Sequence, residues 1–183
     1  MTVEWEGAER PAAVFRPSTK NTLIGAIAIL AVGALGIYGL TEPHDFFLGI
    51  LSAFLVVLGA GGVLGVIAAF RGKTYIALLR EGILQRSITG WSFVPWESIE
   101  VVGYSHVCWQ TNLGLRTKEP PQAGGLLRAV PAFNRRFRGL AGGWDTGLPL
   151  WPTERNEELV ALVRRCIADP EARSQLGHPR PMP

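Results

Sequence analysis

Two long apolar stretches near the N-terminus decide the fold: TLIGAIAILAVGALGIYGL (residues 22–40) and FFLGILSAFLVVLGAGGVLGVIAAF (residues 46–70). Neither stretch contains a charged residue. As α-helices they would be about 28 Å and about 37 Å long, and the hydrocarbon core of a bilayer is about 30 Å thick. Because only residues 41–45 connect them, the two helices must run antiparallel. The sequence therefore predicts a transmembrane hairpin over residues 22–70.

A row of small residues follows the second stretch at a spacing of four. Its small members are Gly49, Ala53, Gly61, Gly65 and Ala69, and Val57 interrupts it. Small side chains allow the backbone of a neighbouring membrane helix to approach closely. We expect the row to pack either within the hairpin or between copies of the chain. The alternative is the general glycine content of membrane helices.

The charges beside the two stretches predict the orientation of the hairpin. Residues 41–45 carry no Lys or Arg, whereas cations precede the first stretch and follow the second: Arg10, Arg16 and Lys20, and then Arg71, Lys73 and Arg80. Positively charged flanks stay on the cytoplasmic side. We expect a multi-pass protein of the cell (inner) membrane with both termini in the cytoplasm and the loop outside. A cleaved signal peptide fits less well. The apolar core of a signal peptide is about 7–15 residues long, whereas the first stretch here has 19 residues and a second apolar stretch follows it directly.

Composition limits the classes of function. The 183 residues include 18% charged residues and carry a net charge of +3, whereas soluble domains average about 25% charged residues. Such a small net charge gives little reason to expect nucleic acid as a partner. Outside the hairpin, enough chain remains for one domain with its own core.

The chain after Lys73 changes to short alternating pieces separated by turn residues. These pieces predict strands at residues 74–79, 83–88, 91–94, 99–109, 112–118 and 148–151. An amphipathic helix follows over residues 153–168, with Thr153 as its N-cap. Residues 131–140 predict a shorter helix in which Phe133, Phe137 and Leu140 share a face. Residues 1–21 and 177–183 show no apolar periodicity and are expected to be disordered tails.

A family resemblance is carried by the turn IALLREGI (residues 76–83), the step VPWESI (residues 94–99) and the closing helix. The chain resembles small bacterial membrane proteins in which two N-terminal spans precede a cytoplasmic pleckstrin-homology-like domain. The resemblance implies an α+β protein: a transmembrane hairpin, then a small antiparallel β-barrel or sandwich over residues 74–176 that a C-terminal α-helix closes. It implies no catalysis. Phosphoinositide-binding members carry Lys and spaced Arg around the first hairpin loop, where this chain has Arg80, Glu81 and Gly82.

The chemistry-bearing residues do not form a catalytic or metal-binding pattern. His106 and Cys108 share a strand face, but zinc takes four ligands and no second pair lies near them in the sequence. No serine lies in a Gly-x-Ser-x-Gly context, and Cys166 falls between core positions of the closing helix. We predict a protein that is not an enzyme and has no metal or cofactor.

Two features are candidates for contact with lipid or with a partner. Arg135, Arg136 and Arg138 form the densest basic cluster, and each Arg near an anionic leaflet contributes about 1 kcal/mol. The alternative is a solvated helix face. Trp144, next to two glycines and Asp145, is the candidate aromatic contact.

The sequence therefore predicts a bilayer protein that presents a cytoplasmic binding or scaffolding module to a membrane or cytoplasmic protein partner, or to a second copy. The alternative function is an accessory subunit of a membrane complex. It would make its contacts through the small-residue row of the second span, with the domain as a regulatory cap.

Overall fold

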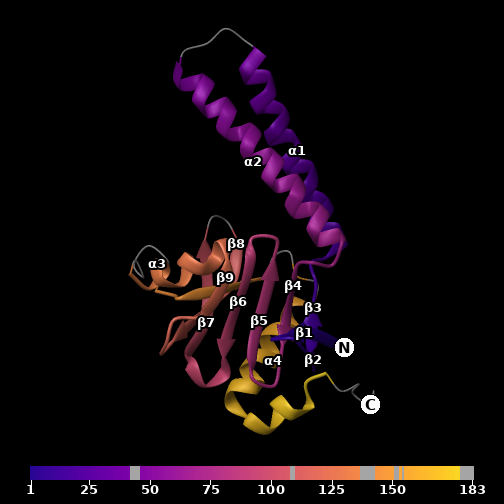
Figure 1. Cartoon of the computed structure of the whole chain (residues 1–183), viewed down its shortest axis with the longest axis vertical. Helices are drawn as coiled ribbons and strands as arrows, with labels where there is room; N and C mark the ends of the chain where they lie inside the picture. Colours follow the sequence, from indigo (N-terminus) through magenta and orange to yellow (C-terminus); the bar gives the residue numbers. More distant parts are fainter. Residues whose placement is uncertain (42–45, 108–109, 137–142, 151–152, 154, 178–183) are drawn as a thin grey trace.

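A helical hairpin projects from one end of a β-rich domain (Figure 1). The computed structural model describes residues 1–41, 46–107, 110–136, 143–150, 153 and 155–177. The loop expected to lie outside the membrane and most of the expected C-terminal tail fall outside these residues.

The hairpin consists of α1 (Thr19–Thr41) and α2 (Phe46–Phe70). The buried residues of the two helices are Gly36, Ser52, Gly59 and Ala68. Most of their large apolar side chains are exposed, whereas a helix in the core of a soluble protein buries such side chains. Both helices are long and apolar enough to cross a membrane.

The domain is built from three antiparallel sheets. A five-stranded sheet has the order β3 (Ala13–Phe15), β4 (Tyr75–Leu78), β5 (Gly82–Ser87), β6 (Gly90–Pro95), β9 (Gln122–Gly125). A three-stranded sheet has the order β10 (Thr146–Pro149), β8 (Gln110–Thr117), β7 (Ile99–Val107). A two-stranded sheet pairs β1 (Thr2–Trp5) with β2 (Ala8–Pro11). Among the described strands, none of these sheets closes on itself.

Two apolar clusters lie in the domain. The larger cluster joins both main sheets to α4 (Asn156–Ala168). Its largest buried side chains are Leu78, Ile83, Trp96, Leu113, Leu115, Leu148, Leu159 and Val163. Trp96 begins the 3-10 turn η1 (Trp96–Ser98), and a second such turn, η3 (Pro170–Gln175), follows α4. The predicted α+β class, with two apolar N-terminal helices followed by antiparallel sheets, is confirmed.

The prediction of a disordered tail over residues 1–21 is wrong. This segment forms β1, β2, β3 and the start of α1. The Trp5 ring packs at 4.9 Å from the Trp91 ring and at 5.1 Å from the Phe93 ring, measured between centroids. With Ala12, Ala77, Leu79 and Leu84, these rings form the second cluster. The segment lacked apolar periodicity because its strands are only three or four residues long and depend on distant partners.

Two predictions for helices also need correction. Arg155, not Thr153, precedes α4 as its N-cap and has a left-handed φ of 59°; the Thr153 hydroxyl donates instead to the Pro149 carbonyl at 2.7 Å. The shorter helix, α3 (Val130–Arg136), follows a 3-10 turn, η2 (Leu126–Ala129). Phe133 is exposed rather than facing the core, while Phe137 and Leu140 lie outside the described residues.

Candidate functional site

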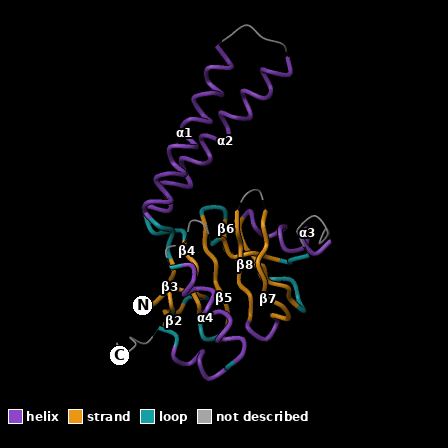
Figure 2. Tube along the Cα trace, turned by 180° about the vertical axis from the view of Figure 1, so that it is seen from behind, coloured by secondary structure: helices purple, strands orange, loops and turns teal. Residues whose placement is uncertain are grey.

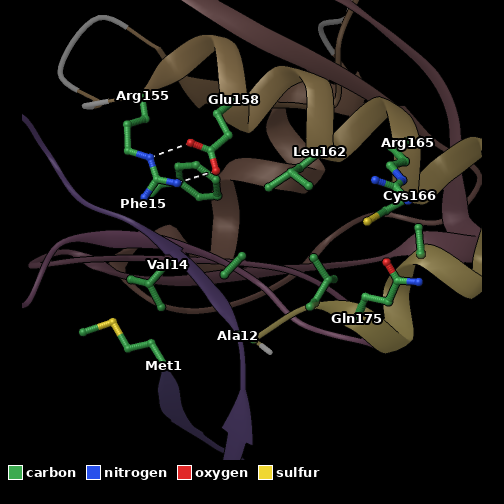
Figure 3. Close-up of a pocket in the computed structure, with 14 residues that line it drawn as sticks. Met1, Ala12, Val14, Phe15, Arg155, Glu158, Leu162, Arg165, Cys166 and Gln175 are labelled. Atoms are coloured by element: carbon green, nitrogen blue, oxygen red, sulfur yellow. Dashed lines mark hydrogen bonds and ion pairs between the residues drawn. The ribbon is translucent and has the colours of Figure 1, made fainter. Parts of the chain in front are cut away.

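A pocket of about 510 Å³ lies between the N-terminal strands and the C-terminal helices (Figure 3). This volume falls within the range of about 300–1,000 Å³ that is typical of sites for small ligands. The N-terminal wall consists of Met1 and the four consecutive residues from Ala12 to Phe15. The opposite wall consists of residues of α4, η3 and the segment after it: Arg155, Glu158, Leu162, Arg165, Cys166, Ala172, Gln175, Leu176 and Gly177.

The N-terminal wall is the edge of a sheet. β3 pairs with β4 on one side, and no other described strand pairs with its opposite side. Two contacts fix the ends of this open edge: the Ala12 N–H donates to the Met1 carbonyl at 2.8 Å, and Pro17 forms an antiparallel bridge with Thr153. An edge strand presents backbone N–H and C=O groups to whatever lies beside it. The pocket therefore offers backbone hydrogen-bonding groups as well as side chains.

The α4 wall carries charged side chains on both sides of an apolar one. At its start, the Arg155 guanidinium donates from Nε to Glu158 at 2.5 Å and makes a second hydrogen bond to the same carboxylate. The guanidinium carbon also lies 5.7 Å from the centroid of the Phe15 ring. Leu162 follows as an apolar surface, and the exposed Arg165 comes one turn later. Figure 3 shows these side chains directed from α4 toward the N-terminal strands.

Cys166 lies in this wall without the properties of a nucleophile. Its side chain is buried, and burial raises the pKa of the thiol, with Arg173 and Arg165 opposing the rise and Asp169 adding to it. Because the thiolate is the nucleophilic form, the neutral thiol serves here as a packing group.

Trp144 covers a sheet surface in the structure. Its ring packs over Gly103 of β7 and Gly114 of β8, which face each other in the ladder. A Cβ on Gly114 would lie 2.4 Å from the Trp144 ring. The next residue, Asp145, is fully buried and accepts hydrogen bonds from the Thr117 N–H at 2.9 Å and the Thr117 hydroxyl at 3.3 Å. These contacts hold the segment against β8, and a partner contact by the half-buried Trp144 stays a prediction.

The predicted basic cluster lies outside the pocket lining. Arg135 donates from Nη2 to the Lys118 carbonyl at 3.0 Å, Arg136 is exposed, and Arg138 lies outside the described residues. His106 lies 3.3 Å from the Thr111 hydroxyl through Nδ1, whereas Cys108 is not among the described residues. In the described parts of the chain, no three metal-binding side chains come together.

The helices of the hairpin pack through glycines other than those of the predicted row. A Cβ on Gly59 would lie 2.7 Å from the Gly33 Cα, and one on Gly36 would lie 2.8 Å from the Ser52 carbonyl oxygen. A Cβ on Gly61 or Gly65 would meet nothing within 4 Å. Positions 59 and 61 point about 200° apart on a helix. At these two glycines, the predicted row therefore does not pack against α1.

The other members of that row are also turned at least partly outward. Ala53 is exposed, and Gly49 and Ala69 are half-buried. Packing of the row against a second copy stays a prediction.

Comparison of the chain with family models, with curated proteins and with solved structures finds no match in any of the three.

Proposed function

We propose that this protein is a two-span membrane protein whose cytoplasmic domain is a binding module, with a pleckstrin-homology-like architecture, for an extended peptide segment of a protein partner. The peptide would lie in the pocket between β3 and α4. The observation that carries this proposal is the open edge of β3, which forms one wall of a pocket whose other wall is a helix.

The chemistry of the pocket favours a peptide over a small anion. A peptide strand can pair with the open edge of β3 through its backbone and place alternate side chains toward the pocket. Leu162 and Val14 offer apolar contact, and Arg165 offers a cation for an acidic side chain. A free anion would find the Arg155 guanidinium already bound to Glu158. It would gain only a weak exposed contact with Arg165.

Photocrosslinking in native membranes tests this site. Benzoylphenylalanine in place of Leu162 is expected to capture a polypeptide, and mass spectrometry of the adduct should place the crosslink within an extended segment. Benzoylphenylalanine in place of Tyr104, which is exposed on β7, measures the nonspecific crosslinking. Arg165→Glu should reduce the adduct by up to about fivefold, because an exposed ion pair contributes at most about 1 kcal/mol.

Arg164 supplies a matched control for that variant. It is the neighbouring exposed arginine of α4 and is not among the residues that line the pocket. Arg164→Glu should leave the adduct unchanged. Equal capture at positions 162 and 104, or equal loss in the two arginine variants, would remove the peptide site.

Membrane topology is tested separately with single cysteines in a chain that lacks Cys108 and Cys166. We expect a Pro43→Cys chain to react with a membrane-impermeant maleimide on intact cells. A Met182→Cys chain should react only after the cells are opened, because the exposed cations Arg16, Lys20 and Lys73 keep both ends of the hairpin cytoplasmic. Labelling of position 182 on intact cells would contradict this orientation.

A second candidate function is favoured by the open space beside Gly61 and Gly65 of α2. This helix face is free to receive a helix of another membrane subunit or of a second copy. The protein would then be an accessory subunit, and the domain would act as its regulatory cap.

A further inference from the structure

Three large apolar side chains are exposed along η2 and α3. The exposed fractions are 80% for Leu126, 42% for Val130 and 57% for Phe133. Val130 and Phe133 lie three residues apart on one face of α3, and Leu126 begins the 3-10 turn η2 that leads into it. Surface apolar residues usually occur singly, so a row of three on one short segment is unusual.

Basic residues accompany this row and acidic ones are missing from the sequence around it. Arg128, Arg135 and Arg136 are exposed, and the sequence has no Asp or Glu between Pro120 and Trp144. Arg135 also bonds back to the domain, so we call Leu126, Val130, Phe133, Arg128 and Arg136 the α3 face. Its composition, with apolar side chains beside arginines, is typical of helices that lie in a membrane interface.

Contacts on the inner side of α3 hold the segment to the domain. Pro131 is buried, the Asn134 amide donates to the Asp145 carbonyl at 3.2 Å, and Arg135 donates to the Lys118 carbonyl at 3.0 Å. The α3 face is therefore presented outward by a segment with a fixed position.

The α3 face lies on the same side of the domain as the hairpin. In Figures 1 and 2, α3 lies in the half of the domain from which the hairpin leaves, at the opposite edge from the foot of the hairpin. In both views the hairpin leans across the domain toward α3. This lean brings the α3 side of the domain toward the bilayer that the hairpin spans. The foot of the hairpin carries the exposed cations Arg16, Lys20, Arg71 and Lys73, which mark the level of the headgroups.

We infer that the α3 face lies in the headgroup region of the membrane that the hairpin spans. Leu126, Val130 and Phe133 insert at the boundary of the acyl chains, and the arginines contact the phosphates of anionic lipids. The inference rests on the membrane insertion in the proposed function and is independent of the peptide site.

A second membrane contact gives the domain one orientation. The hairpin foot and the α3 face lie at opposite edges of the domain, so together they prevent it from swivelling about the tether. α4 lies in the half of the domain away from the hairpin (Figure 1). Held in this way, the domain presents the pocket between β3 and α4 to the cytoplasm.

Lipid photocrosslinking of the full chain tests the inference. Benzoylphenylalanine replaces Phe133 in protein reconstituted into vesicles of phosphatidylcholine and phosphatidylglycerol. The control is the same replacement of Tyr104, which has a similar exposed fraction of 53% and lies beside Arg164 of α4. We expect phospholipid adducts at position 133 and few at position 104.

Removal of the anionic lipid or of an apolar side chain of the α3 face should lower the yield of lipid adducts at position 133. In vesicles of phosphatidylcholine alone the yield should fall at least about fivefold, because a single Arg near an anionic leaflet accounts for about that factor. Leu126→Asp, a change at a mostly exposed position, should lower the yield without altering the circular dichroism of the protein.

Three outcomes would overturn the inference. Equal lipid adducts at positions 133 and 104 would place the α3 face in water. Adducts between two copies of the chain in place of lipid would make it a self-association surface. Extraction of the protein from the vesicles by carbonate would remove this inference together with the membrane insertion, whereas missing lipid adducts in a carbonate-resistant protein would remove this inference alone.

Discussion

Replacement of Trp96 by alanine is expected to lower the free energy of unfolding of the domain by about 3–5 kcal/mol, as is typical of a large core side chain. Trp96 is only 2% exposed and belongs to the larger apolar cluster. Its indole N–H donates to the Leu79 carbonyl at 2.9 Å, and the Arg173 guanidinium carbon lies 5.9 Å from its ring centroid. The side chain thus joins η1, the end of β4 and η3, and alanine would leave both a cavity and an unpaired buried carbonyl.

Hydrogen exchange of the full chain in nanodiscs measures this effect. In the Trp96→Ala chain, the amides of β4, β5 and β6 should exchange faster by the factor that corresponds to the loss of free energy of unfolding. Trp96→Phe keeps most of the packing and loses the hydrogen bond to Leu79, so it should cost about 1–3 kcal/mol. Protection of β5 at the wild-type level in the Trp96→Ala chain would show that this ring does not hold the core together.

The helical hairpin could be predicted because its signal is local. A charge-free stretch of the right length predicts a membrane helix regardless of the rest of the chain. The main strands from β4 to β8 were also predictable within a few residues, because alternation and turn residues mark them. β9 and the N-terminal strands were not, because they depend on pairing with distant segments. The Trp5 ring packs on Trp91 and Phe93, and β3 pairs with β4 across the whole length of the hairpin.

The pocket could not be predicted because its two walls come from opposite ends of the chain. Residues 12–15 and 155–177 face each other across it, beside the bridge between Pro17 and Thr153. Neither segment contains a recognisable motif. For Trp144, the glycines that explain its position are Gly103 and Gly114 on distant strands, not the glycines beside it in the sequence.

Replacement of Gly59 by leucine is expected to separate the two helices of the hairpin. A Cβ at this position would lie 2.7 Å from the Gly33 Cα, and because the contact is with backbone, a leucine cannot be accommodated by a side-chain rotation. The helices should move apart toward the axial separation of about 10 Å that is found for large interface side chains. Double electron–electron resonance between spin labels at positions 20 and 71 in nanodiscs measures this separation. The Gly59→Leu chain should show a longer and broader distance distribution than the wild type.

Gly61→Leu is the matched control, with the same substitution two residues further along α2. A Cβ at position 61 meets nothing within 4 Å in the described structure, so the distance between the labels should stay at the wild-type value.

The same variant tests the accessory-subunit function. If the row of Gly49, Ala53, Gly61, Gly65 and Ala69 packs against another helix, Gly61→Leu should lower the oligomeric mass in detergent or release a co-purifying membrane subunit. Unchanged mass and composition would dismiss the accessory-subunit function. A widened hairpin in Gly61→Leu and an unchanged one in Gly59→Leu would reverse the helix faces assigned here, because the two positions point in nearly opposite directions.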